Sequence, residues 1–335
     1  MVSVRERAPR GVRIVGVIAL LLAAPVFAEL LQSYLPNTDA ALEILLALVF
    51  LAPLYGGAAL LIREVALRTG RGWRGRLLLA ASFGVLMPTL VDGSLFTPVN
   101  PGIDYWDDIM GSTRVGRLSA YAATAWMLGH VVMSIGAPLV VVEASLPEGR
   151  ARPWLGRWGL VVLAVLGAAV GFLVHVDPDR APVKAGVLDY VVSLVVILAL
   201  VAVAMTPVGR PLTPAEGRGA GRPVLLGLAG FGLMAGFDLA PISWAGVFLA
   251  WVVFVAAGSL LAVLSRSKQW TWRHLAAFTL GAVLARTMTG FLSPVPQGVS
   301  AAAKLSQNLV FLLLVLAIGG LVWARTREPA TDSAA

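Results

Sequence analysis

The chain has 335 residues, of which 58% are hydrophobic and 13% are charged, and its formal net charge is +8. Soluble globular proteins contain about 45–50% apolar and about 25% charged residues, so this composition excludes a set of water-soluble domains and indicates a polytopic membrane protein. The absence of cysteine excludes disulfides, thiolate metal sites and cysteine nucleophiles, and only three histidines are present.

Ten stretches are long and apolar enough for transmembrane helices, which need about 20 residues to cross a hydrocarbon layer of about 30 Å. Their apolar runs are continuous rather than alternating, which favours helices over strands. The predicted spans are residues 12–33, 41–62, 77–97, 119–145, 157–176, 187–207, 223–242, 244–264, 274–292 and 305–324. The sequence therefore predicts an all-α polytopic membrane protein in which residues 1–335 form a single transmembrane domain.

The first predicted span has a second interpretation. Its arginine-rich start, its apolar core and the small-residue pattern Val26-Phe27-Ala28 before Glu29 are also typical of a cleaved signal peptide. The second span starts outside the membrane in either case, so the topology of the remaining chain is the same.

Lysine and arginine residues are distributed unevenly between the two sides of the predicted spans. Twenty of the 26 lie in the tails and in alternate connections, namely Arg5, Arg7, Arg10, Arg13, Arg63, Arg68, Arg71, Arg74, Arg76, Arg150, Arg152, Arg157, Arg210, Arg218, Arg222, Arg266, Lys268, Arg273, Arg325 and Arg327. The opposite side holds Arg114, Arg117, Arg180, Lys184 and Lys304, and Arg286 lies inside the ninth span. Because Lys and Arg are enriched in cytoplasmic connections, we expect both termini in the cytoplasm and the chain in a bacterial plasma membrane. The positive charge thus reports topology and gives no indication of a nucleic-acid partner.

Five ionisable residues fall in the outer halves of five different spans. They are Glu29, Asp92, His130, Asp238 and Arg286. Ionisable groups inside a membrane are energetically unfavourable and often mark pathways for ions or substrates, so these five are candidate substrate- or ion-binding residues. The structural alternative is that they pair with one another, Arg286 most naturally with Asp92 or Asp238.

Proline residues also draw attention to the first four spans, which contain Pro25, Pro53, Pro88 and Pro138. Proline interrupts the backbone ladder of a helix, and in a membrane the freed carbonyls are tolerated where protein or a wet cavity meets them. These positions predict either irregular backbone beside a cavity or simple packing kinks.

Charged residues at the cytoplasmic boundary have a more conventional interpretation. Glu64 follows Arg63 directly, and Glu143 ends the fourth span near Arg150. Both arrangements predict charge pairs at the ends of helices rather than a binding site.

Motifs for several classes of chemistry are missing. There is no HExxH, no GxSxG and no GxxxxGK[ST] sequence, so the usual signatures of a zinc protease, a serine hydrolase and a nucleotide-driven pump are absent. His130, Glu29 and Asp92 could supply three zinc ligands, but no closely spaced ligand pair supports them. We expect no metal and no cofactor.

Three segments together resemble a group of multi-pass membrane proteins of unassigned activity from high-GC actinobacteria. The segments are residues 55–64 leading into Gly70-Arg-Gly-Trp73, residues 82–98, and residues 130–143. That group is in turn similar to CPBP-type intramembrane proteases, which carry a Glu-Glu pair in the third span and histidines on two further helices. Here Met87 and Pro88 occupy the positions of the pair and only His130 lies well inside a span, so the chain departs from the pattern of a working glutamate/histidine protease.

The polar residues of the outer half therefore predict a permease-like transporter or binding protein with an outward-facing intramembrane polar cavity. Glu29 and Asp92 would carry protons or cations, His130 would titrate, and the remaining two residues would hold an ionic substrate group. The alternatives are a membrane-embedded enzyme, either a degenerate CPBP-like protease or a lipid-modifying enzyme, and a non-catalytic accessory subunit. The expected partners are membrane lipids and a small-molecule, ionic or lipid substrate, and the sequence does not define the oligomeric state.

Overall fold

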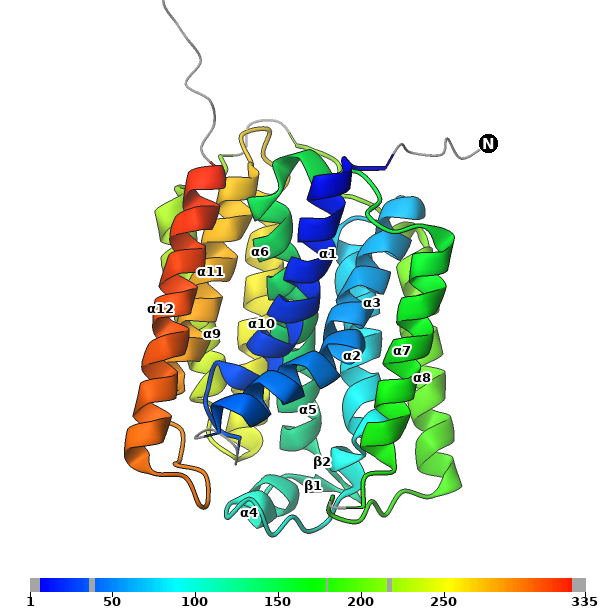
Figure 1. The fold of residues 1–335 in the computed structure, drawn as a ribbon, viewed down its shortest axis with the longest axis vertical. Coiled ribbons are helices and arrows are strands. Elements are labelled where there is room, and N and C mark those ends of the chain that lie inside the picture. Colours follow the sequence, from blue (N-terminus) through cyan, green and yellow to red (C-terminus); the bar gives the residue numbers. More distant parts are fainter. Residues whose placement is uncertain (1–6, 36–39, 179, 216–218, 327–335) are drawn as a thin grey trace, which may run out of the picture.

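A computed structural model describes residues 7–35, 40–178, 180–215 and 219–326. Helices form a bundle, and one end of it is covered by a short helix and by a hairpin whose two strands have two residues each (Figure 1). The first residues of α1 and the last residues of α12 are both at the opposite end of the bundle (Figure 1). The long helices are α1 (Arg10–Pro25), α2 (Ala41–Arg68), α3 (Trp73–Leu86), α5 (Ala120–Gly129), α6 (Ala137–Ser145), α7 (Arg157–His175), α8 (Val187–Met205), α9 (Pro223–Asp238), α10 (Trp244–Leu264), α11 (Trp272–Thr289) and α12 (Ala301–Arg325).

The all-α class is confirmed, and eight helical segments in the described residues are long and apolar enough to cross a membrane. They are residues 10–30, 41–68, 73–91, 120–145, 157–175, 187–205, 244–264 and 301–325. The predicted seventh and ninth spans also fall on helices, but neither α9 nor α11 is among these eight segments. The helix α9 has 16 residues, which is shorter than any of the eight. Only 6% of the apolar window of α10 is buried within the protein, so its side chains face outward, where a bilayer would surround them.

Three of the first four spans change from α-helix to π-helix part-way along their length. The π-helical segments are η1 (Val26–Leu30), η2 (Met87–Val91) and η4 (His130–Gly136). Pro25 precedes η1, Pro88 lies within η2, and Pro138 follows η4, which explains the change because proline removes one donor from the ladder. Backbone irregularity thus occurs at three of the four prolines, whereas Pro53 lies inside the uninterrupted helix α2.

Close backbone approach holds α9 against α11. A side chain at Gly281 would lie 1.9 Å from the carbonyl oxygen of Gly227, and one at Gly230 would lie 2.0 Å from that of Phe278. Neither position can accept a Cβ unless the two helices separate, because both obstructing atoms belong to the backbone. Glycine at these positions therefore fixes the distance between α9 and α11.

The end of the bundle remote from the chain termini is covered by α4 (Trp106–Gly111) and by the strands β1 (Arg114–Val115) and β2 (Leu118–Ser119) (Figure 1). The Ser119 hydroxyl donates to the carbonyl of Ile109 at 2.5 Å and accepts from the backbone N–H of Ala122. Trp106 stacks on Trp126 of α5, with ring centroids 5.5 Å apart. This cap is thus attached firmly to the fourth span.

Candidate functional site

Glu29 lies on η1 and is held by two phenols. The hydroxyl of Tyr55 on α2 donates to one carboxylate oxygen, and the hydroxyl of Tyr34 donates to the other. Although 36% of the surface of Tyr34 is exposed, its hydroxyl faces Glu29. Burial and the Glu29 carboxylate therefore raise the pKa of Tyr34, while the guanidinium of Arg286 lowers it.

His130 is the first residue of η4 and lies in an aromatic setting. Its ring centroid is 5.9 Å from that of Tyr55 and 5.9 Å from that of Phe83 on α3. Its Nδ1 atom is 2.9 Å from the hydroxyl oxygen of Ser134, which is 1% exposed. Tyr55 thus contacts both Glu29 and His130, and it connects the two predicted site residues.

Asp92 follows η2 directly. Its carboxylate accepts the backbone N–H of Ser94 at 2.7 Å, at the start of the 3₁₀ turn η3 (Ser94–Phe96). Gly93 between them has φ of +64°, a conformation that favours glycine. The carboxylate therefore ends one membrane-spanning segment and begins the turn that follows it.

Asp238 and Arg286 form an ion pair between α9 and α11, which is the partner choice that the sequence left open between Asp92 and Asp238. The Asp238 side chain is fully buried and that of Arg286 is 20% exposed. The hydroxyl of Thr289 donates to the second oxygen of Asp238 at 2.8 Å. Gln32, three residues after Glu29, donates to Thr289 at 3.3 Å, so this pair is connected to the segment that carries Glu29.

Direct contacts divide the five predicted residues into two groups and a turn, and the charges of Glu29, Asp92 and Arg286 all act on His130. Glu29 and His130 share Tyr55, Asp238 and Arg286 pair directly, and Asp92 bonds to its own turn. The helical spacing of His130 and Ser134 placed these two residues on one face, as the structure has them, whereas sequence reasoning missed the other neutral residues, which are Gln32, Tyr34, Tyr55 and Thr289. Tyr55 is the one tyrosine of the second span, and a phenol hydroxyl inside a span needs a hydrogen-bond partner, which was the signal that could have revealed this connection.

Arg63 is the centre of a second polar network at the opposite end of the bundle. Its side chain is fully buried and donates to Glu143 at 2.8 Å and to Glu64 at 2.9 Å. The remaining N–H groups reach the carbonyl oxygens of Gly149, Arg150 and Arg152 at 2.7, 3.3 and 3.2 Å. Its guanidinium carbon also lies 3.5 Å from the ring centroid of Trp154.

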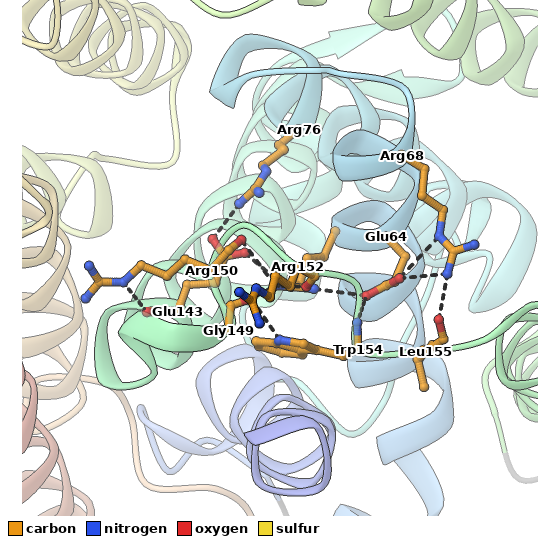
Figure 2. A network of polar contacts seen from close by, with 10 residues as sticks. Glu64, Arg68, Arg76, Glu143, Gly149, Arg150, Arg152, Trp154 and Leu155 are labelled. Carbon is orange, nitrogen blue, oxygen red and sulfur yellow. Dashed lines mark hydrogen bonds and ion pairs between the residues drawn. The ribbon is translucent and has the colours of Figure 1, made fainter. Parts of the chain in front are cut away.

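The two carboxylates of this network are fully buried as well, and Figure 2 shows the contacts that Glu64 and Glu143 make. Glu143 accepts from Arg76 at 2.5 Å in addition to Arg63, and Glu64 accepts from Arg68 at 3.1 Å and from the backbone N–H of Trp154 at 2.7 Å. The predicted pairing of Glu64 with Arg63 is confirmed. Arg150, in contrast, donates to the carbonyl oxygens of Glu143 and Ala144 rather than to a carboxylate.

Every charged group in the Arg63 network has opposite charges or backbone dipoles around it, so the network ties α2, α3, α6 and residues 147–155 together. Arrangements of this kind satisfy buried charge and leave no group free to bind a ligand. We therefore assign it a structural role and regard the residues around Glu29, Asp92, His130 and the Asp238–Arg286 pair as the candidate site.

Two cavities lie near these networks, and neither has any of the five predicted residues in its wall. One, of about 230 Å³, lies between α3, α6, α9, α10 and α11 and is almost entirely apolar, with Val131, Phe237, Phe254 and Phe278 in its wall. The other, of about 470 Å³, lies beneath the cap and is lined by both charged and apolar side chains. Among the described residues, no group of three or more acidic or histidine side chains is arranged to hold a metal ion.

Comparisons of the chain with protein-family models, with curated proteins and with solved structures found no match. The functional assignment therefore depends on the geometry of the residues described above.

Proposed function

We propose that the protein is a permease-like transporter of a bacterial plasma membrane, with the polar residues of the outer half as its substrate- or ion-handling site. A single observation carries the proposal. Each of the three π-helical segments holds or adjoins one of the predicted ionisable residues: Glu29 lies in η1, Asp92 follows η2, and His130 begins η4. Segments of this kind occur frequently at functional sites, because the extra residue leaves backbone groups available for a ligand or a rearrangement.

The residues around these segments suit proton or cation handling. Glu29 has two phenol donors that can rotate, and His130 lies beside one of them with a serine hydroxyl at hydrogen-bond distance. A carboxylate, a phenol and an imidazole in contact provide a path along which protons can move. The outward-facing cavity would open where the π-helical segments of the first, third and fourth spans meet.

Hydrolysis is the second candidate, because His130 and Ser134 have the separation of a general base and its nucleophile. Ser134 is only 1% exposed and lies within a helix, so a peptide or lipid carbonyl cannot reach its hydroxyl without a large opening. Transport of a small solute or ion requires a smaller opening at the same site, and we favour transport for that reason.

The proposed topology has ten spans with both termini in the cytoplasm. The helix α9 has 16 residues and would extend about 24 Å, which suffices for a somewhat thinned or protein-surrounded segment. Because the chain has no cysteine, single variants can be labelled without background. Ser112→Cys should react with a membrane-impermeant maleimide in intact cells and Ala151→Cys only after lysis; the reverse pattern would contradict the topology.

The function is tested by comparing the solutes taken up by a deletion strain with those taken up after complementation. Wild type should restore the profile, and His130→Ala or Asp92→Asn should not restore it at equal membrane abundance. Asp108→Asn is the matched control, because Asp108 is an exposed residue of α4 outside the candidate site, and it should restore the profile fully.

Full restoration by both site variants would refute the transport assignment for these residues. A changed lipid composition in the deletion strain, with no altered solute, would favour the enzymatic alternative instead.

A further inference from the structure

Three of the five basic residues that the topology places outside line one cavity beneath the cap. They are Arg114 on β1, Arg117 in the hairpin turn and Lys184 in the connection between α7 and α8. Cytoplasmic connections normally hold such residues, so their concentration on the opposite side needs another explanation. The cavity has a volume of about 470 Å³, and Asp107 is the one acidic residue in its wall.

The cavity is built by backbone contacts between segments that are distant in the sequence. The N–H of Lys184 donates to the carbonyl of Phe96 at 2.9 Å, and the guanidinium of Arg117 donates to the carbonyl of Lys184. Gly93 permits this docking, because a Cβ there would lie 2.5 Å from the side chain of Val183. The basic side chains are therefore presented by a fixed framework rather than by independent loops.

The cations in this wall differ in how far their charge is already neutralised. Arg117 forms an ion pair with Asp189 at 3.3 Å, and 62% of its side chain is exposed. The one side-chain bond of Arg114 runs from Nε to the carbonyl of Gly116, which leaves its terminal nitrogens available. Among the described residues, no hydrogen bond or ion pair engages the ammonium of Lys184.

We propose that this cavity is a binding site for a phosphate-type oxyanion. Arginine presents a planar pair of donors that matches phosphate oxygens, and lysine adds a point charge. The volume is greater than inorganic phosphate requires, so the site accommodates a phosphate ester with part of its substituent. Such a group is supplied either by a free phosphorylated solute or by the headgroup of an anionic lipid in the outer leaflet.

The test uses the full-length protein purified in an uncharged detergent, with inorganic phosphate as the probe and line broadening of its ³¹P NMR signal as the measurement. Wild type should bind, and Arg114→Gln or Lys184→Gln should weaken binding about tenfold, because each removes one charge-assisted contact. Lys184→Arg should retain binding. Arg180→Gln is the matched control: Arg180 lies in the same connection but outside the cavity wall, so its loss should change affinity less than about twofold.

A second arm distinguishes the two sources of the anion. Nanodiscs of phosphatidylcholine with phosphatidylglycerol are prepared for each variant, and the retained phosphatidylglycerol is counted by native mass spectrometry. Retention that is lost in Arg114→Gln and Lys184→Gln, without phosphate binding in detergent, assigns the site to a lipid headgroup.

Failure of both arms would overturn the proposal, and so would an equal loss of binding in Arg180→Gln, which would indicate general attraction by positive charge. All these residues are exposed, and size-exclusion profiles identify any variant that does not fold. Binding is measured without transport, so this result is independent of the transport function proposed above.

Discussion

Substitution of Glu143 by glutamine provides the most direct test of the Arg63 network. The change keeps the shape of the side chain but removes one negative charge from a position with no solvent exposure. It leaves the guanidinium groups of Arg63 and Arg76, whose side chains are 0% and 10% exposed, facing a neutral amide. Removing one partner of a buried ion pair destabilises proteins by about 3–5 kcal/mol.

A loss of this size lowers the folding equilibrium constant by about 150- to 4,000-fold, at about 1.4 kcal/mol for each factor of ten. It can be measured by reversible unfolding in mixed micelles with increasing dodecyl sulfate. Arg117→Gln is the control, because 62% of the Arg117 side chain is exposed in its pair with Asp189, and solvent-exposed pairs contribute about 0.2–1 kcal/mol.

The double variant Glu143→Gln/Arg76→Gln restores the charge balance of the network, so it should be less destabilised than the sum of the two single variants. If Glu143→Gln lowers the free energy of unfolding by no more than about 1 kcal/mol, which is the loss expected for the control, the assignment of Glu143 as a required buried charge is wrong.

Three further predictions concern the outer half and the helix contacts. Gly281→Ala should destabilise the protein by about 1–3 kcal/mol, since its Cβ meets the backbone of α9. Gly232→Ala is the control, because its Cβ would enter open space, and this variant should be neutral or slightly stabilised. Thermal unfolding compares the two variants. Asp238→Asn should lower the free energy of unfolding by about 3 kcal/mol, because Arg286 then lacks its counter-ion. Adding Arg286→Gln should restore part of this stability in the same assay, and no recovery would contradict the pairing. Tyr55→Phe should reduce transport more than Tyr34→Phe in the complemented strain, because only Tyr55 also contacts His130, and equal effects would refute its connecting role.

The positions of the helices could be predicted because hydrophobic length is a local property of the sequence. The runs around α7, α8 and α10 need no knowledge of their neighbours, since a bilayer satisfies their apolar side chains directly. The prolines also act locally, and three of the four lie in or beside π-helical segments, namely Pro25, Pro88 and Pro138.

Partner choice could not be predicted, because it depends on which helices become neighbours. Asp92 and Asp238 were equivalent candidates for Arg286 until the contact of α9 with α11 placed Asp238 beside it. The burial of Arg63 was missed for a related reason, since three of its acceptors lie in residues 149–152, which the sequence suggests only as an ordinary connection.

That separation along the chain has a consequence for biogenesis. Ribosomes add about 5–20 residues per second, so the acceptors at residues 149–152 are synthesised about 4–18 s after Arg63. During this interval the guanidinium of Arg63 has Glu64 beside it but lacks Glu143 and the three carbonyl oxygens, so the side chain must stay hydrated at the membrane surface. Closure of residues 147–155 over Arg63 is consequently a late event in assembly, and it joins the second, third and fourth spans only after all three have been synthesised.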